Sequence, residues 1–144
     1  MIGPISLCSA VFVAGLSVLI HFECLSFLNR GLERFRSSRA RLLATMIGLL
    51  TAHVIEIWLY AGAYYALITW TEVGAIHTGI VESQSLLDLV YYSAMVYTTV
   101  GFGDMIPSGG IRLVTATEAL VGLSLITWSA SFTYFQMQVQ FGHR

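Results

Sequence analysis

The chain has 144 residues, of which 56% are hydrophobic and only 10% are charged, and its formal net charge is -1. Soluble domains carry roughly 25% charged residues, so a chain this apolar would expose more hydrophobic surface than a water-soluble monomer tolerates. These values exclude a soluble domain and predict one membrane domain, with the bilayer as its solvent.

The first apolar run covers residues 5–28 and is long enough for one membrane-spanning helix. Only His21 and Glu23 interrupt it, near its end. Residues 1–4 have no positive charge, so we do not expect a cleaved signal peptide. The two cysteines lie in or beside this run and are expected to pack, because they cannot build a disulfide framework or a four-ligand metal site: Cys8 and Cys24.

A polar connection, residues 29–41, follows and carries five arginines. Short loops rich in arginine stay in the cytoplasm, so we expect the N-terminus outside and the C-terminus, with His143 and Arg144, inside. Binding of anionic lipid headgroups is a further expectation for this connection. Its arginines are Arg30, Arg34, Arg36, Arg39 and Arg41.

The second apolar run, residues 42–70, is longer than the roughly 20 residues that a bilayer requires, and its end is rich in interfacial aromatic residues. Residues 86–97 form a shorter semi-apolar segment, which predicts a re-entrant helix because it is too short to span. Residues 111–135 predict a third span. Acidic residues dominate the intervening segment 71–110 and would concentrate cations at its surface: Glu72, Glu82, Asp88 and Asp104.

The string YTTVGFGD, residues 97–104, stands between the short helix and the last span. A narrow pore passes a dehydrated ion only if oxygen ligands replace its water, and stacked backbone carbonyls provide them densely. Aiming successive carbonyls the same way requires unusual backbone angles at alternate residues, which glycine adopts without strain at Gly101 and Gly103. The Thr99 hydroxyl can add a ring of oxygens, and the C-terminal dipole of the preceding helix favours a cation there.

At these residues the sequence resembles the potassium-channel family, whose filter signature is a T-V-G-Y-G-like string followed by Asp. The matching residues are Thr99, Val100, Gly101, Phe102, Gly103 and Asp104, with Thr98 before them. Pro107, Arg112 and Gly122 fit the context, and the resemblance extends over about residues 42–140. A plain turn and a cation channel of relaxed selectivity are the alternatives for this string.

The resemblance implies an all-α membrane protein with three transmembrane helices, a re-entrant pore helix and a selectivity filter, assembling as a homotetramer. It divides the chain into an extra N-terminal helix at 1–28, a basic cytoplasmic connection at 29–41 and a pore domain at 42–144. Potassium is the expected ligand, with no other cofactor, no catalysis and no nucleic acid. The expected location is the plasma membrane, as in small prokaryotic channels. A non-conducting or regulatory subunit is the rival interpretation.

Two departures from the family pattern affect the support of the filter. Phe102 stands where Tyr is commonest, which removes a hydroxyl. Met95 stands where some members have a Glu that pairs with the Asp after the filter. Asp104 must therefore find another partner, for which the Tyr91 phenol is our candidate, or face water.

The last span offers a hinge and a pore lining. Gly122 matches the inner-helix hinge of the family and is also suited to close packing. Four residues recur from it at helical spacing and are candidates for a cavity lining and gate, although lipid-facing residues would look equally apolar: Leu123, Ile126, Ala130 and Tyr134.

Three ionisable residues within the spans require an explanation, because such groups are costly in lipid. His53 and Glu56 lie three apart and share a helix face. A proton-sensitive switch, a metal site with His21 and Glu23, and a helix-to-helix hydrogen bond all remain open for them. Glu118 is expected behind the pore helix, either bracing the filter's surroundings or making a structural hydrogen bond.

Overall fold

The computed structural model describes residues 2–31, 37–79 and 85–141, with the side chains of residues 2, 38, 140 and 141 excepted. Three helices within these ranges are long and apolar enough to cross a membrane. They are α1 (Ile2–Gly31, 30 residues), α2 (Ser38–Trp70, 33 residues) and α4 (Ile111–Phe141, 31 residues). Each helix contains one predicted apolar run and extends beyond it, so the three predicted spans are confirmed.

The segment between α2 and α4 holds the short helix α3 (Leu86–Tyr97), with the boundaries predicted from the sequence. It also holds two strands of three residues, β1 (Ile76–Thr78) and β2 (Met105–Pro107), which pair antiparallel with His77 opposite Ile106. The fold is thus the predicted helical membrane fold with a small ladder added. Strands of three residues are too short to show a hydrophobic periodicity, so they could not be predicted from the sequence.

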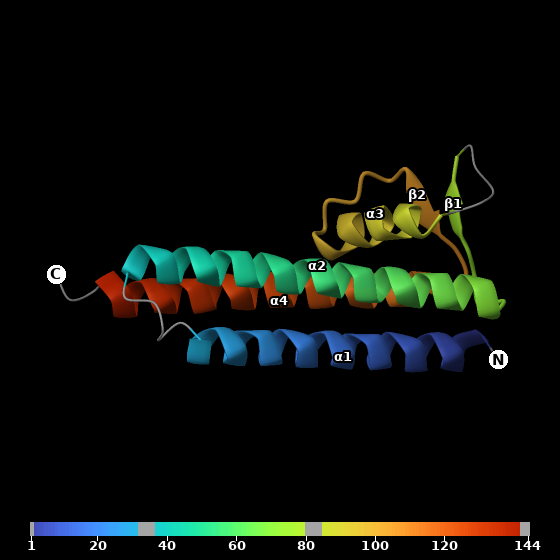
Figure 1. Cartoon of the computed structure of the whole chain (residues 1–144). Coiled ribbons are helices and arrows are strands. Elements are labelled where there is room, and N and C mark those ends of the chain that lie inside the picture. The colour runs from blue at the N-terminus through green and yellow to red at the C-terminus, as the bar shows by residue number, and fades with distance from the viewer. Residues whose placement is uncertain (1, 32–36, 80–84, 142–144) are drawn as a thin grey trace.

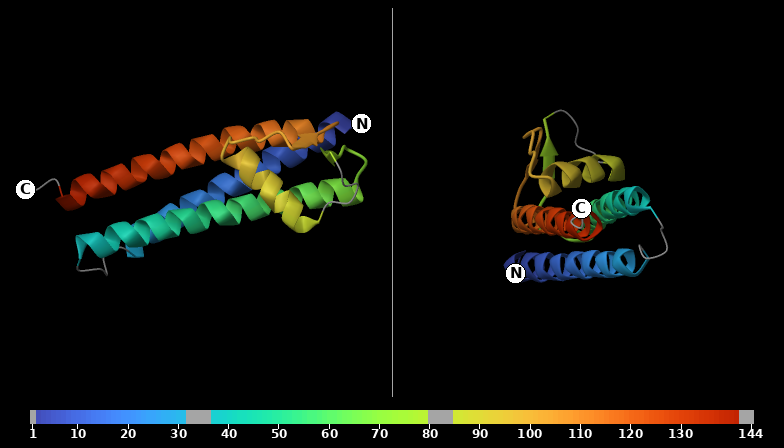
Figure 2. Two further views of the ribbon diagram at one scale, coloured as in Figure 1. Left: turned by 90° about the horizontal axis from the view of Figure 1, so that it is seen from above. Right: turned by 90° about the vertical axis from the view of Figure 1, so that its left-hand side faces the viewer.

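The helices are arranged in layers (Figures 1 and 2). α2 and α4 lie side by side in the middle layer, and α3 with the β-ladder covers one of its faces near one end. α1 lies along the opposite face. The segment that follows α3 therefore stands on the side of the molecule away from α1.

α1 packs on this middle layer through small side chains. Ser6, Ala10, Val13 and Ser17 are all buried and recur every three or four residues. Small residues let membrane helices approach closely, where packing replaces the hydrophobic effect as the cause of association. Gly48 of α2 serves the same contact, because a β-carbon there would lie only 2.5 Å from the Leu28 side chain.

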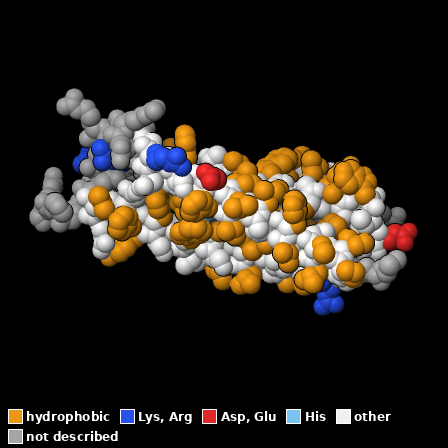
Figure 3. Space-filling view, turned by 90° about the horizontal axis from the view of Figure 1, so that it is seen from below, with side chains coloured by type: hydrophobic (Ala, Val, Ile, Leu, Met, Phe, Trp, Pro, Cys, Tyr) orange, Lys and Arg blue, Asp and Glu red, His pale blue; other side chains and the backbone are white. Residues whose placement is uncertain are grey.

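The two ends of the molecule differ in composition. The beginning of α1, the end of α2 and the β-ladder gather at one end, and the end of α1 and the start of α2 gather at the other. Arg30, Arg39 and Arg41 are at the second end, on the helices themselves. Figure 3 shows hydrophobic side chains over the whole length of one face, with charged side chains few and mostly toward the ends. Five residues of the sequence predictions lie outside the described residues: Arg34, Arg36, Glu82, His143 and Arg144.

Candidate functional site

The short helix α3 has well-defined ends. Ser85 caps its N-terminus in a capping box with Asp88, since the Ser85 hydroxyl accepts from the Asp88 amide and the Asp88 carboxylate accepts from the Ser85 amide. The C-terminal cap is Thr98, whose hydroxyl donates to the Ala94 carbonyl at 2.6 Å. The partial negative charge of the helix C-terminus lies where the next segment begins.

The next segment is residues 99–103, for which the sequence predicts a selectivity filter, and it is called here the filter segment. Three alternate residues in it have positive φ angles: Thr99 at 60°, Gly101 at 53° and Gly103 at 80°. Thr99 is the only non-glycine residue with a positive φ in the part of the chain that the structure describes. A threonine in this conformation costs about 1 to 3 kcal/mol, a strain typical of functional backbone.

Two backbone hydrogen bonds hold the filter segment against α3. The Thr99 amide donates to the Val96 carbonyl at 2.9 Å, and the Gly101 amide donates to the Met95 carbonyl at 3.1 Å. The residues themselves are exposed in the single chain, Val100 to 53% and Phe102 to 71%. Non-helical backbone at membrane depth is tolerated only against protein or water, so this surface requires one or the other.

Behind the filter segment is a cavity of about 160 Å³ between it and α3, lined by Met95, Phe102 and Thr115 among others. At its border the Tyr91 hydroxyl donates to Asp104 Oδ2 at 3.0 Å, which confirms the partner expected for this carboxylate. That hydrogen bond raises the pKa of the Tyr91 phenol, which is protonated at neutral pH in any case and is therefore the donor. The Met95 side chain lines the cavity, and its thioether has no proton to donate to Asp104.

A buried carboxyl group holds the middle of α3. Glu118 of α4 is fully buried, and it accepts from the Ser93 hydroxyl of α3 and from the Tyr64 hydroxyl of α2, each at 2.5 Å. Ser93 also reaches the Ile57 carbonyl at 2.9 Å. Glu118 thus lies behind α3, as predicted, and its two partners link α4 to both α2 and α3.

The end of α3 packs directly on α4 at Gly122. A β-carbon at this position would lie 2.9 Å from the Tyr97 carbonyl carbon and closer still to its oxygen. Any side chain at residue 122 would therefore displace the residue that precedes Thr98. The close packing predicted at Gly122 is confirmed, while its role as a hinge stays a prediction.

Glu56, also fully buried, holds the same end of α3 from another side. Its carboxylate accepts from the Tyr97 hydroxyl and contacts His21 Nδ1 at 2.9 Å and His53 Nδ1 at 3.3 Å. The helix-to-helix hydrogen bond predicted for Glu56 is confirmed. Ser129 of α4 contacts both histidines from the other side, so the cluster reaches all four helices.

Sequence reasoning found only part of these two clusters. The spacing of His53 and Glu56 placed them on one helix face, and His21 of α1 was named only as one of two candidate further ligands for a metal site with them. Glu23, the other candidate of α1, is exposed and is not in this cluster. Nothing in the sequence marks Ser129 and Tyr97 as partners of these groups, and only the packing of the helices shows that they belong to the cluster.

The predicted lining residues of the last span share a surface. Leu123, Ile126, Ala130 and Tyr134 are all exposed in the single chain. The last three line a groove of about 680 Å³ between α2 and α4, together with Thr98, the residue just before the filter segment. A continuous surface therefore leads from the filter segment along α4.

Comparisons with known proteins agree with this geometry. Residues 42–138 match a family model described as an ion channel. The chain is also 31% identical, over 114 residues, to the uncharacterized membrane protein YdjJ of Bacillus subtilis (strain 168). That alignment covers 76% of this chain and 33% of the relative, so the chain spans about a third of the relative's length. No solved structure matches the chain significantly.

Proposed function

The chain belongs to the ion channel family, and on that premise we propose that four copies form a potassium-selective pore whose filter is residues 99–103. The observation that carries the proposal is the alternation of positive φ angles at Thr99, Gly101 and Gly103. Alternating backbone angles let successive carbonyl groups face the same axis, which is what a filter of carbonyl rings requires.

Potassium is the ion that such rings select. The carbonyls of Thr99, Val100, Gly101 and Phe102, with the Thr99 hydroxyl, would replace its hydration shell, and ions in adjacent sites would displace one another. Conduction is passive, so no residue has to perform catalysis. The C-terminus of α3 adds a negative potential at the inner end of the filter.

The proposal of a tetramer rests on the filter segment, which one chain leaves open on one side. A single filter segment is open on its exposed side, and a ring of carbonyls needs copies around a common axis. The face that carries α3 and the filter segment is opposite α1, so this face can meet the other copies while α1 stays at the periphery. α1 would then contact lipid along its exposed face.

Two buried clusters support the filter in this proposal. Glu118 fixes the middle of α3 through Ser93, and Glu56 fixes its end through Tyr97. Each carboxylate lies on a membrane-spanning helix, so the position of the filter depends on how α2 and α4 pack. A filter site has to be held by groups whose own positions are fixed, because small displacements change the ion's coordination.

The groove along α4 leads to the position at which we place the gate. Tyr134, 64% exposed, lies one helical turn beyond Ala130 on the surface that leads away from Thr98. Four phenol rings converging there would make an apolar constriction, which closes by losing its water. In this proposal the arginine-rich end lies on the cytoplasmic side of the plasma membrane and contacts anionic lipid headgroups.

The experiment that tests this function is flux through the purified chain in liposomes. Vesicles loaded with potassium should lose it through the protein down the gradient, and vesicles loaded with sodium should not. Scanning pH and voltage in the same assay would identify the gating stimulus. Absence of potassium flux from vesicles that contain intact tetramers, verified by native mass spectrometry, would favour a non-conducting subunit.

A further inference from the structure

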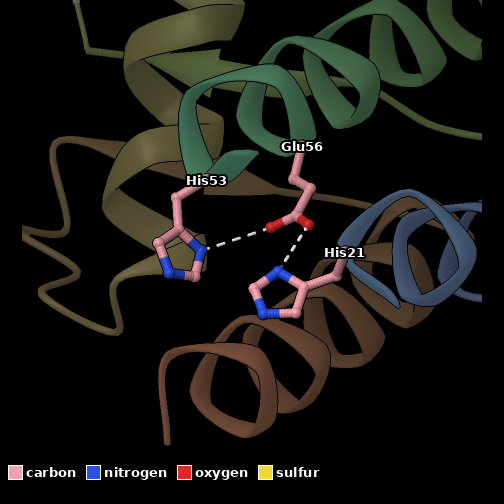
Figure 4. A group of neighbouring side chains, drawn as sticks. All are labelled: His21, His53 and Glu56. Carbon is pink, nitrogen blue, oxygen red and sulfur yellow. Dashed lines mark hydrogen bonds and ion pairs between the residues drawn. The ribbon is translucent and has the colours of Figure 1, made fainter. Parts of the chain in front are cut away.

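The three ionisable side chains His21, His53 and Glu56 form a compact group between α1 and α2, called here the histidine cluster (Figure 4). Their potential metal-binding atoms all lie within 4.8 Å of one another. In Figure 4 one nitrogen of each imidazole points at the Glu56 carboxylate, and these are the Nδ1 atoms. His21 and Glu56 are fully buried, and His53 is partly buried.

The far side of both imidazole rings meets a single hydroxyl group. Ser129 Oγ lies 3.2 Å from His21 Nε2 and 3.0 Å from His53 Nε2. A hydroxyl has one proton and two lone pairs, so it can donate to only one of these nitrogens but can accept from both. The hydroxyl therefore satisfies both nitrogens either by accepting from two Nε2–H groups or by donating to one Nε2 and accepting from the other. The first arrangement is the one compatible with metal binding through both Nδ1 atoms.

When Ser129 accepts from both Nε2–H groups, the Nδ1 atoms of both neutral imidazoles carry a free lone pair. These lone pairs face a carboxylate, since His21 Nδ1 lies 2.9 Å and His53 Nδ1 lies 3.3 Å from the Glu56 oxygens. His53 Nδ1 also lies 2.9 Å from the Tyr97 hydroxyl, whose single proton goes either to the Glu56 carboxylate or to this nitrogen. Two imidazole lone pairs and a carboxylate this close together are a ligand set for a divalent cation, and a cation there leaves the Tyr97 proton to the carboxylate.

We propose that the histidine cluster is a binding site for Zn²⁺ or a chemically similar borderline divalent cation, held by His21 Nδ1, His53 Nδ1 and Glu56. Two imidazoles with one carboxylate suit Zn²⁺ and its neighbours, whereas Mg²⁺ and Ca²⁺ prefer oxygen ligands alone. Ser129 accepts from both distal N–H groups, as the oxygen behind a metal-bound histidine usually does. The fourth coordination position remains for water.

The site has an entrance for a hydrated ion. His53 and Ser129 border the groove of about 680 Å³ that also reaches Thr98 and Tyr134. A cation in this groove meets His53 first, and the two buried ligands lie behind it. Because the groove leads to the exposed surface of α4, the site can exchange metal without unfolding of the helices.

A cation here would fasten α1 to α2 beside Tyr97, at the end of α3. Metal occupancy would then regulate conduction through the position of Tyr97, a consequence that rests on the proposed function. The binding itself does not rest on it. Metal binding and ion flux are therefore measured separately, and failure of one leaves the other interpretable.

The test uses the full chain in detergent, purified without a histidine tag and loaded with Zn²⁺ before desalting. We expect about one Zn²⁺ per chain, by elemental analysis. The variants His21→Gln and His53→Gln, which keep much of the side-chain volume, should lose it, and His77→Gln at the β-ladder is the matched control that should retain it. Mg²⁺ offered in place of Zn²⁺ should not be retained.

Two further measurements test the site even if the histidine variants fail to fold. Ser129→Ala should weaken Zn²⁺ binding about ten-fold or more, while Ser131→Ala two residues away should not. Co²⁺ added to the unmodified chain should give the intense visible absorption of a tetrahedral nitrogen and oxygen site, without a thiolate band from Cys24. Zn²⁺ retention equal in the unmodified chain and in His21→Gln/His53→Gln, or an octahedral Co²⁺ spectrum, would overturn the proposal.

Discussion

Gly122 of α4 lies against the backbone carbonyl of Tyr97, the residue at which α3 ends, with no room for a β-carbon between them. Tyr97 precedes Thr98 and the filter segment, so this close contact between α3 and α4 lies directly before the filter segment. A change in either helix at this point moves the beginning of the filter directly.

The first prediction is that Gly122→Ala disturbs the filter. The added methyl group overlaps the Tyr97 carbonyl, and overpacking of this kind costs about 1 to 3 kcal/mol. We expect less tetramer and lower potassium flux per tetramer. Gly62→Ala on α2 is the matched control, because a β-carbon there meets nothing within 4 Å and alanine favours a helix. Equal behaviour of the two variants would mean that the Tyr97 contact is unimportant.

The second prediction concerns the tie between Tyr91 and Asp104. Tyr91→Phe removes the donor and leaves the carboxylate beyond the filter without this hydrogen bond. We expect potassium currents that decline faster during a sustained voltage step, with unchanged selectivity. Tyr65→Phe, on an exposed part of α2, is the control. If Asp104→Asn changes the time course and Tyr91→Phe does not, Asp104 acts without Tyr91.

The third prediction tests the gate at Tyr134. Tyr134→Ala should raise basal potassium flux, because it removes the four rings that would form an apolar constriction. Selectivity should not change, since it resides at the filter segment. Tyr65→Ala, another exposed tyrosine, should leave basal flux unchanged. Basal flux in Tyr134→Ala equal to that of the unmodified chain would remove Tyr134 from the gate.

The fourth prediction is the orientation in the membrane. Single cysteines would replace Gly3, His77 and Ser37 in a chain whose Cys8 and Cys24 have been changed to Ser. An impermeant thiol reagent applied outside intact cells should label positions 3 and 77 but not position 37, because the arginine-rich end stays inside. Labelling of position 37 from outside would reverse the topology.

The sequence predicted the helices well because each apolar run had to satisfy the bilayer thickness. It also predicted the contact of Tyr91 with Asp104, since Tyr91 lies on the short helix and Asp104 directly follows the motif. It could not predict that His21 would reach Glu56, 35 residues away. That contact depends on the register of α1 against α2, which small residues such as Gly48 set through close packing rather than through a visible pattern.

The Glu118 cluster shows the same division. A carboxyl group within an apolar span indicates that it has hydrogen-bond partners, because burying an unpaired carboxyl group in lipid costs too much free energy. Its partners, Ser93 and Tyr64, come from two other helices and carry no signal of their own in the sequence. The kind of interaction was predictable, whereas the residues that make it required the structure.

The most direct test of a potassium-selective pore is the reversal potential of the purified chain in a planar bilayer, with potassium on one side and sodium on the other. We expect a reversal potential close to that of a membrane permeable to potassium alone. We also expect Gly101→Ala to abolish this selectivity or the current, because alanine resists a φ of 53° by about 1 to 2 kcal/mol. Gly15→Ala, in an open part of α1, should retain both. A reversal potential near zero in the unmodified chain, or full selectivity in Gly101→Ala, would contradict the assignment of residues 99–103 as the filter.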